Sequence, residues 1–259
     1  MNNKILIAKV GGKIIDDKVK LTAFLKDFAA IDYPKILIHG GGNIATKLSK
    51  QMNITTDLVD GRRITSDENL EVVTMVYAGL INKRITAQLQ AFNSNAMGLS
   101  GCDANCITAF KRVSNPIDFG WVGDVEKINT TTIQLLIKNK ITPVFSAICH
   151  DQKGQLLNTN ADTITAEIAI AMSERYNSTV VYCFEKQGVL KNINEEDSVL
   201  ENIDFATYET LKSEGIINQG MLPKLENSFH ALRNKVSQVK IGNQHILGKA
   251  ENQHTTITL

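Results

Sequence analysis

Short apolar runs alternate with longer amphipathic stretches along the whole chain. Residues 5–10 and 35–39 are apolar runs of strand length, whereas residues 19–30 and 43–52 are amphipathic stretches of helix length. The order strand, helix, strand, helix is typical of proteins whose sheet is largely parallel. The hydrophobic pattern therefore predicts an α/β fold.

Elements of both kinds continue to the C-terminus. Residues 67–92 read as one long helical stretch, with Ser66 or Asp67 as its cap and a break near Gly79. Residues 101–125 are rich in turns and resemble a hairpin. The other expected elements are helices over residues 162–173, 207–214 and 222–234, strands over residues 95–99, 141–148, 178–184 and 236–241, and an edge strand over residues 255–259.

A soft boundary falls near residues 173–178, where a helix is expected to end. We expect two lobes, residues 1–175 and 176–259, that share one continuous sheet as a single unit. Ligands of open α/β sheets usually bind beyond the carboxyl ends of the strands. We therefore expect the ligand-binding residues at the carboxyl ends of the predicted strands.

Charge and composition narrow the class of protein. The 28 basic and 27 acidic residues leave a formal net charge of +1, which predicts no nucleic-acid or anionic-membrane surface. No apolar run approaches the roughly 18 residues that span a bilayer, and no signal-peptide pattern opens the chain, so a cytoplasmic location is expected. Cys102 and Cys106 have the CxxxC spacing of some zinc sites, but no second ligand pair accompanies them, and we expect no metal there.

Two glycine-rich turns follow the first two predicted strands. Lys9 precedes Gly11 and Gly12, and the run from His39 to Gly42 contains three consecutive glycines ahead of a helix. Glycines let a backbone approach a ligand closely and leave N–H groups free for anionic oxygens. Neither the GxGxxG fingerprint nor the GxxxxGK[ST] loop occurs, so the pattern indicates another kind of phosphate site. A lysine at a strand end can equally extend its amine to water, and that alternative stays open for Lys9.

Three further segments carry polar side chains that could bind a ligand. The arginine pair in GRRIT suits a carboxylate, although only one of two adjacent arginines should reach a given ligand, and a solvated pair is the simpler interpretation. The NTNAD run holds Asn158, Asn160 and Asp162, more polar groups than a helix cap requires. Lys224 follows Pro223 at a predicted helix N-terminus, where a bound anion would offset the unfavourable helix dipole.

Taken in order, the runs IAKVGG, HGGG, GRRIT, NTNAD and GMLPKLEN resemble the amino acid kinase family, specifically its acetylglutamate kinase branch. The resemblance covers essentially the whole chain. It implies a three-layer αβα sandwich with a mainly parallel sheet of about eight strands. It also implies that the first lobe binds an acylated amino acid and that the second lobe binds ATP with Mg²⁺.

The resemblance assigns roles by position in the motifs. Lys9 and Lys224 match the lysines that stabilise the transferring phosphoryl group, and Asp162 matches the aspartate that orients both. The remaining matched residues are Gly11 and Gly12 for phosphate, Gly41, Gly42, Arg63, Asn158 and Asn160 for the substrate, and Glu185, Gly188, Asn218, Gly220 and Met221 for the nucleotide.

The implied reaction is phosphorylation of the γ-carboxylate of N-acetyl-L-glutamate in arginine biosynthesis. N-succinyl-L-glutamate as acceptor, another kinase of the same fold, and a catalytically inactive nucleotide-binding regulator remain alternatives. The chain departs from the family pattern at Phe184–Glu185, where a Ser/Thr–Asp pair is usual, and at Cys102, where lysine is frequent. Because the N-terminal helix of the hexameric, arginine-inhibited members has no counterpart here, the resemblance implies a homodimer that arginine does not inhibit.

Overall fold

The computed structural model describes residues 3–59, 62–114, 116–192, 194–217, 221–248 and 252–259. Within these residues eight strands form one sheet in the order β12-β14-β13-β11-β1-β2-β8-β5. Its strands are β1 (Lys4–Val10), β2 (Lys35–His39), β5 (Ala96–Leu99), β8 (Thr142–Ser146), β11 (Asn177–Cys183), β12 (Asn202–Ile203), β13 (Gln238–Gly242) and β14 (Thr255–Ile257). Each neighbouring pair is parallel except β13 with β14, which confirms the mainly parallel sheet.

The central strands are apolar on both faces because helices cover both sides of the sheet. All five residues of β2 are buried, and so are most residues of β1 and β11. The parallel register places Val10 opposite both His39 and Cys183. The carboxyl ends of three strands therefore meet at one edge, beside the two glycine-rich turns.

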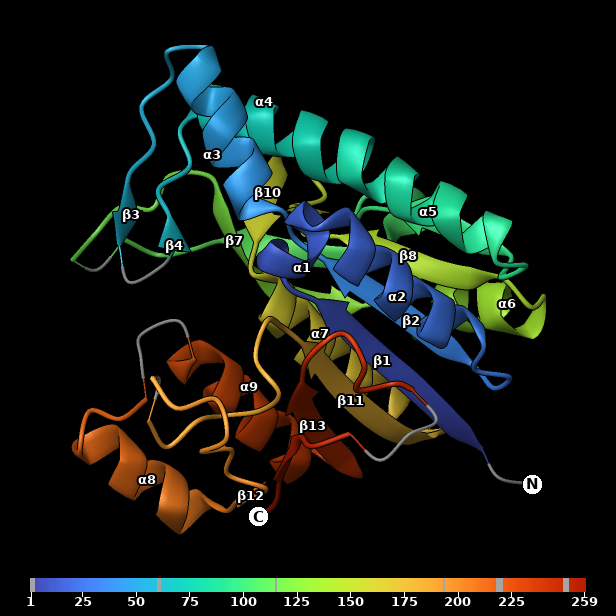
Figure 1. Ribbon diagram of the computed structural model, residues 1–259. Coiled ribbons are helices and arrows are strands. Elements are labelled where there is room, and N and C mark those ends of the chain that lie inside the picture. The colour runs from blue at the N-terminus through green and yellow to red at the C-terminus, as the bar shows by residue number, and fades with distance from the viewer. Residues whose placement is uncertain (1–2, 60–61, 115, 193, 218–220, 249–251) are drawn as a thin grey trace.

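Two layers of helices enclose this sheet (Figure 1). The short α1, α2, α3 and the long helical rod labelled α4 and α5 lie over one face, while α7 lies on the other face with α9 packed against it. The helical segments are α1 (Gly12–Asp16), α2 (Lys18–Ala29), α3 (Gly42–Gln51), α4 (Asp67–Thr74), η1 (Met75–Ile81), α5 (Asn82–Ala91), α6 (Thr130–Lys138), α7 (Ala161–Met172), α8 (Phe205–Ser213) and α9 (Leu222–Arg233). The predicted αβα arrangement is confirmed.

The long helix over residues 67–92 begins as predicted, but it does not break near Gly79. Ser66 caps it by accepting a hydrogen bond from the backbone N–H of Asn69 at 3.2 Å. The middle of the rod, η1, is a π-helical stretch, so the backbone stays helical through Gly79. The prediction of a break was wrong because an exposed glycine weakens a helix without ending it.

A smaller closed sheet flanks the carboxyl edge of the main sheet. The predicted hairpin is present as β6 (Ile107–Lys111) paired antiparallel with β7 (Val122–Ile128). β9 (Ile148–His150) and β10 (Leu156–Thr159) complete this second sheet. The strand expected over residues 141–148 is thus two strands, because the chain leaves the main sheet after Ser146. A two-stranded ladder of β3 (Leu58–Val59) and β4 (Arg62–Arg63) lies beside α3 (Figure 1).

Further differences from the sequence-based prediction concern short or peripheral elements, among them α1, β3, β4 and β12, which were not predicted. α6 and β10 were not predicted either. β14 was predicted as an edge strand, but it is the second strand from the edge, because β12 pairs with its outer side. No helix in the described ranges combines the length and the apolar character needed to cross a membrane.

Candidate active site

Two lysines, Lys224 buried and Lys9 largely so, share one carboxylate at the centre of the molecule. Lys9 Nζ lies 2.9 Å from Asp162 Oδ1, and Lys224 Nζ lies 3.0 Å from Asp162 Oδ2. The three residues are far apart in the sequence, yet the fold brings them together as predicted. The array carries one net positive charge, which suits an anionic ligand.

Each member of this array is held by a different element. Lys9 is the penultimate residue of β1, and Lys224 lies in the first turn of α9, where Pro223 also lies. Asp162 is the second residue of α7, whose N-terminal cap is Asn160. The Asn160 side chain accepts hydrogen bonds from the backbone N–H groups of Asp162 and Thr163 at 2.7 and 3.3 Å. Asn160 thus caps α7, and this cap fixes the carboxylate between the lysines.

Burial and charge act in opposite directions on the protonation of these groups. Burial alone would raise the pKa of Asp162, but Lys224 and Lys9 overcome it and hold that pKa well below its usual range. Burial lowers the pKa of Lys224 to about 8, although Asp162 partly opposes the shift. The Lys224 ammonium also lies 4.7 Å from the centroid of the Tyr182 ring. At neutral pH the carboxylate is ionised and Lys224 is mainly protonated.

The glycine turns border the lysine pair. Gly11 donates its N–H to Cys183 O at 2.8 Å, and Gly12 is the first residue of α1. Gly41 caps α3 with φ +154°, and a Cβ built there would lie 2.1 Å from Ile81 Cδ1. Only glycine fits that position. Lys9 and the predicted glycines Gly12, Gly41 and Gly42 line one pocket of about 270 Å³ with Asp162.

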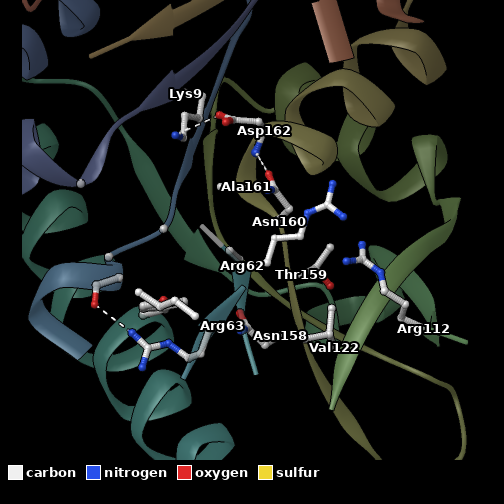
Figure 2. A pocket seen from close by; sticks show the side chains of 17 residues that line it. Lys9, Arg62, Arg63, Arg112, Val122, Asn158, Thr159, Asn160, Ala161 and Asp162 are labelled. Carbon is white, nitrogen blue, oxygen red and sulfur yellow. Dashed lines mark hydrogen bonds and ion pairs between the residues drawn. The ribbon is translucent and has the colours of Figure 1, made fainter. Parts of the chain in front are cut away.

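Arg63 lines the same pocket, but its terminal nitrogens face the protein. Nη2 donates to Gly42 O at 3.1 Å and to Thr46 Oγ1 at 2.6 Å. Nη1 donates to Thr56 Oγ1 at 3.2 Å and lies 3.5 Å from Asn69 Oδ1. Figure 2 shows the guanidinium directed toward α3, away from Lys9. Arg63 therefore directs its terminal N–H groups to the protein, and one of them holds Gly42 O in the glycine turn.

The other predicted acceptor-side residues lie on the pocket wall. Asn158, at the end of β10, donates from Nδ2 to Thr65 Oγ1 at 3.0 Å. Asn160, Thr159 and Ala161 continue the wall from Asn158 to Asp162 (Figure 2). These residues form one continuous strip of polar groups beside the lysines.

The residues predicted to bind the nucleotide are spread more widely than those that line the pocket. Glu185 forms an ion pair with Lys13 at 2.6 Å, and Met221 is the buried residue that precedes α9. Burial alone would raise the pKa of Glu185, but the hydrogen bond from Lys13 holds it below its usual value. Gly188 packs against β14, since a Cβ there would lie 2.6 Å from Thr255 Oγ1. The predicted residues Asn218 and Gly220 lie outside the described part of the chain.

Several lining residues were missed by sequence reasoning. Arg62, the arginine of the pair that received no role, lines the pocket, and so do Arg112 and Val122 in the β6–β7 hairpin, which had no assigned role either. Tyr77 in η1 and Leu58 in β3 complete the wall. No local motif marks these positions, because the tertiary fold of the hairpin and of β3–β4 brings them to the pocket.

The described residues hold no cluster of three His, Cys, Asp or Glu side chains suited to a metal ion. Asp162, the carboxylate among the described pocket residues, is already engaged by two lysines. The donors that remain are ammonium groups and backbone N–H groups, which bind phosphate oxygens. A divalent cation would fit this site as a partner of bound phosphates and water.

Comparison with known proteins shows which family this chain belongs to. Residues 4–243 match the amino acid kinase family. A Cytophaga hutchinsonii protein named acetylglutamate kinase is 49% identical over 255 residues, which cover 98% of this chain and 97% of that protein. A Bacteroides fragilis protein of the same name is 49% identical over 241 residues, covering 93% and 92% of the two chains.

Solved structures at low identity share the fold. N-acetylglutamate synthase from Neisseria gonorrhoeae superposes with a TM-score of 0.81 at 20% identity, covering all of this chain and 60% of the other. Carbamate kinase from Giardia lamblia bound to AMP-PNP gives a TM-score of 0.70 at 13% identity over 98% of each chain. The match over most of the sequence, the high identity to full-length relatives and the shared fold together show that this chain is a member of the amino acid kinase family.

Proposed function

We propose that this protein transfers the γ-phosphoryl group of ATP to the γ-carboxylate of N-acetyl-L-glutamate, a step of arginine biosynthesis. The observation that carries the proposal is the Lys9–Asp162–Lys224 array beside two glycine turns. Relatives that are 49% identical and almost fully covered bear the name of this activity. The size of the pocket suits a small amino-acid derivative.

The reaction needs charge stabilisation more than proton transfer. A γ-carboxylate oxygen attacks Pγ, the bond from Pγ to the β,γ-bridging oxygen breaks, and ADP leaves with the electron pair. The attacking carboxylate is already ionised at neutral pH, so no general base is required. Lys9 and Lys224 stabilise the negative charge on the transferring group, and Asp162 holds both ammonium groups in position.

The acceptor is positioned by the strip of polar groups and by the second glycine turn. We assign the γ-carboxylate to the backbone N–H groups near Gly41 and Gly42, and the amide and α-carboxylate to Asn158 and Asn160. Arg63 acts on the same contacts by holding Gly42 O and by presenting its remaining Nε–H. Arg63 was expected to be the main ligand of the α-carboxylate. We propose instead that it shares this role with Asn158 and Asn160.

We assign the nucleotide to the second lobe, residues 176–259, at Glu185, Gly188, Asn218, Gly220 and Met221. ATP brings Mg²⁺, which neutralises phosphate charge and is held mainly by phosphate oxygens and water. The balanced charge of the chain and the biosynthetic role of its named relatives support a cytoplasmic enzyme that acts on small molecules.

The test is an ADP-release assay with N-acetyl-L-glutamate, L-glutamate and L-aspartate as acceptors. We expect turnover with the acylated substrate and little with the free amino acids, because the amide replaces a charged ammonium group. Binding of ATP without turnover of any acylated glutamate would instead identify an inactive regulator of the same fold. Retention of Lys9, Asp162 and Lys224 in contact favours the enzyme.

A further inference from the structure

The pocket has a second cationic end, formed by Arg62 and Arg112. In Figure 2 the lysine–aspartate contact lies at one end of the pocket and Arg112 and Val122 lie at the other. The side chains of Arg62 and Arg112 reach toward the same region between these ends. Neither arginine belongs to the array that stabilises the phosphoryl group.

Arg112 is fixed in place but incompletely bonded. Its backbone N–H donates to Val122 O at 2.8 Å, and its guanidinium lies over the Phe119 ring at 5.6 Å from the centroid. Nε donates to Asp124 Oδ2 at 3.0 Å, and Nη2 forms an ion pair with Asp124 Oδ1. Nη1 is buried and has no hydrogen-bond partner in the described part of the chain. A buried donor without an acceptor costs stability, which an anionic ligand would restore.

Arg62 adds a charge that the described residues do not neutralise. It follows a gap at residues 60–61 and is exposed at the pocket rim, and no ion pair or hydrogen bond of its side chain occurs within the described ranges. Asp124 compensates one of the two guanidinium groups. Among the described residues, one positive charge at this end therefore has no compensating carboxylate.

An N-acetyl group leaves this charge without a partner. With the γ-carboxylate of N-acetylglutamate assigned to Gly41 and Gly42, its α-carboxylate is assigned to the strip from Asn158 to Asn160. The acyl group then extends toward Arg62, Arg112 and Val122, and a methyl group offers the arginines nothing to bind. A longer acyl group can place methylene carbons on Val122 and an anionic end between the guanidinium groups.

We propose that the preferred acceptor bears a carboxylate at the end of its N-acyl group, so that a dicarboxylic acyl chain bridges from the glutamate nitrogen to Arg62 and Arg112. This inference rests on the proposed acylglutamate kinase function. N-acetyl-L-glutamate remains a substrate, because its reacting end makes the same contacts, but it binds less well.

The first experiment compares acceptors with the wild-type protein. N-acetyl-, N-succinyl-, N-glutaryl- and N-succinamoyl-L-glutamate are assayed for ADP release at saturating ATP. The succinamoyl compound has the size of the succinyl compound without its charge. We expect kcat/KM for N-succinyl-L-glutamate to exceed the values for the acetyl and succinamoyl compounds by about tenfold or more, the effect of one charge-assisted contact.

The second experiment removes the charge from the protein. Arg112→Met and Arg62→Met replace each guanidinium by an unbranched, uncharged side chain, and Lys127→Met removes an exposed cation from the same hairpin as the matched control. We expect each arginine variant to lower kcat/KM about tenfold or more for N-succinyl-L-glutamate and less than about threefold for N-acetyl-L-glutamate. The control should leave both values unchanged.

The outcomes separate this inference from the proposed function. Equal or better use of N-acetyl-L-glutamate by the wild-type protein overturns the dicarboxylic acceptor and leaves the kinase intact. Equal losses for both acceptors in Arg112→Met overturn it as well. Absence of turnover with every acylglutamate overturns both. Because the wild-type comparison stands alone, the inference stays testable even if Arg112→Met does not fold.

Discussion

At the residue scale, the chemistry depends on two ammonium groups that share one carboxylate. Neither lysine can move far without leaving Asp162 buried beside one cation only, since the side chains of Lys9 and Lys224 are 14% and 7% exposed. Such a buried triad is a costly arrangement, and it persists where it serves a function. Its geometry leads to two predictions about catalysis.

Replacing either lysine should reduce turnover more than it reduces substrate binding. Lys9→Met and Lys224→Met are expected to lower kcat by about 100-fold or more, because each removes an interaction that strengthens as charge develops in the transition state. KM for the acceptor should change little. Steady-state kinetics check this, with Lys26→Met on the outer side of α2 as a control that keeps normal turnover. Near-normal kcat in both active-site variants would refute the mechanism.

The activity should also fall as the pH rises through about 8. Catalysis needs Lys224 in its charged form, and burial lowers its pKa to about 8, so the active fraction is lost above that pH. The acceptor carboxylates are ionised throughout this range and cannot cause the decline. A pH profile of kcat/KM measures the effect. In Lys224→Arg the guanidinium stays charged, so the decline near pH 8 should disappear even if turnover is lower; a decline that persists would exclude Lys224 as its source.

At the scale of elements, the carboxyl end of β2 and the turn that follows it determine the shape of the pocket. Gly41 passes close under η1, and His39 is buried between β2 and α5. His39 acts through the elements that it joins, whereas Gly41 also lines the pocket.

Gly41→Ala should lower both the thermal stability and the turnover of the protein, whereas Gly79→Ala should lower neither. At Gly41 the backbone has φ +154° and a Cβ would overlap Ile81, so the turn and the start of α3 must shift. At Gly79 no atom lies within 4 Å of a Cβ, and alanine favours the helix by about 1 kcal/mol or less. Thermal unfolding and turnover of both variants test this pair. Equal stability of the two variants would contradict it.

His39 should make folding sensitive to moderate acid. Its Nδ1–H lies 2.9 Å from Gly40 O, and its Nε2 accepts from Asn82 Nδ2 at 3.0 Å, so the folded ring is neutral. Burial lowers its pKa to about 4. Between the unfolded value of about 6.5 and this value the unfolded chain binds the proton, so stability falls as the pH falls.

We expect the free energy of unfolding to drop by about 2 kcal/mol between pH 7 and pH 5 through His39. Urea unfolding at the two pH values measures the change. In His39→Gln, which cannot titrate, the difference should largely vanish, even if the variant is less stable at pH 7. A pH dependence of the same size in this variant would assign the effect to other groups.

From the sequence, the residues at the centre of the site could be predicted, but several of those on the surrounding pocket wall could not. Lys9 and Lys224 were identifiable because each adjoins a glycine or proline signal, and Asp162 because the NTNAD run exceeds the needs of a cap. The role of Arg112 depends on how the β6–β7 hairpin folds over the sheet, which no local pattern encodes. α6 was missed because three consecutive threonines are weak helix formers, although Asn129 caps it at the N–H of Thr132.

At the scale of the whole molecule, the outer surface of the long helix suggests how copies of the chain associate. Met75 and Leu80 in η1 are 49% and 41% exposed, and Met97 in the neighbouring edge strand β5 is 40% exposed. Large apolar side chains grouped on one side often mark an interface. We infer that this surface is the interface of a homodimer, the assembly that the sequence resemblance implies.

Sedimentation equilibrium should therefore give twice the 28.5 kDa mass of one chain. Charged substitutions at Met75 and Leu80 should shift the protein toward the monomer, because they place like charges against each other across a twofold interface. The control Val19→Glu alters another exposed apolar residue, on α2, and should leave the mass unchanged. A hexamer, or a dimer insensitive to the η1 substitutions, would contradict this interface.

The pairing of β1 has a consequence for synthesis of the chain. β1 lies between β2 and β11, and its partner on one side is more than 170 residues away in the sequence. While the chain emerges from the ribosome, the first 175 residues present a bare, apolar strand edge that waits for residues 177–183. Truncated products should therefore aggregate, and the nascent chain should depend on chaperones until β11 is available to close the sheet.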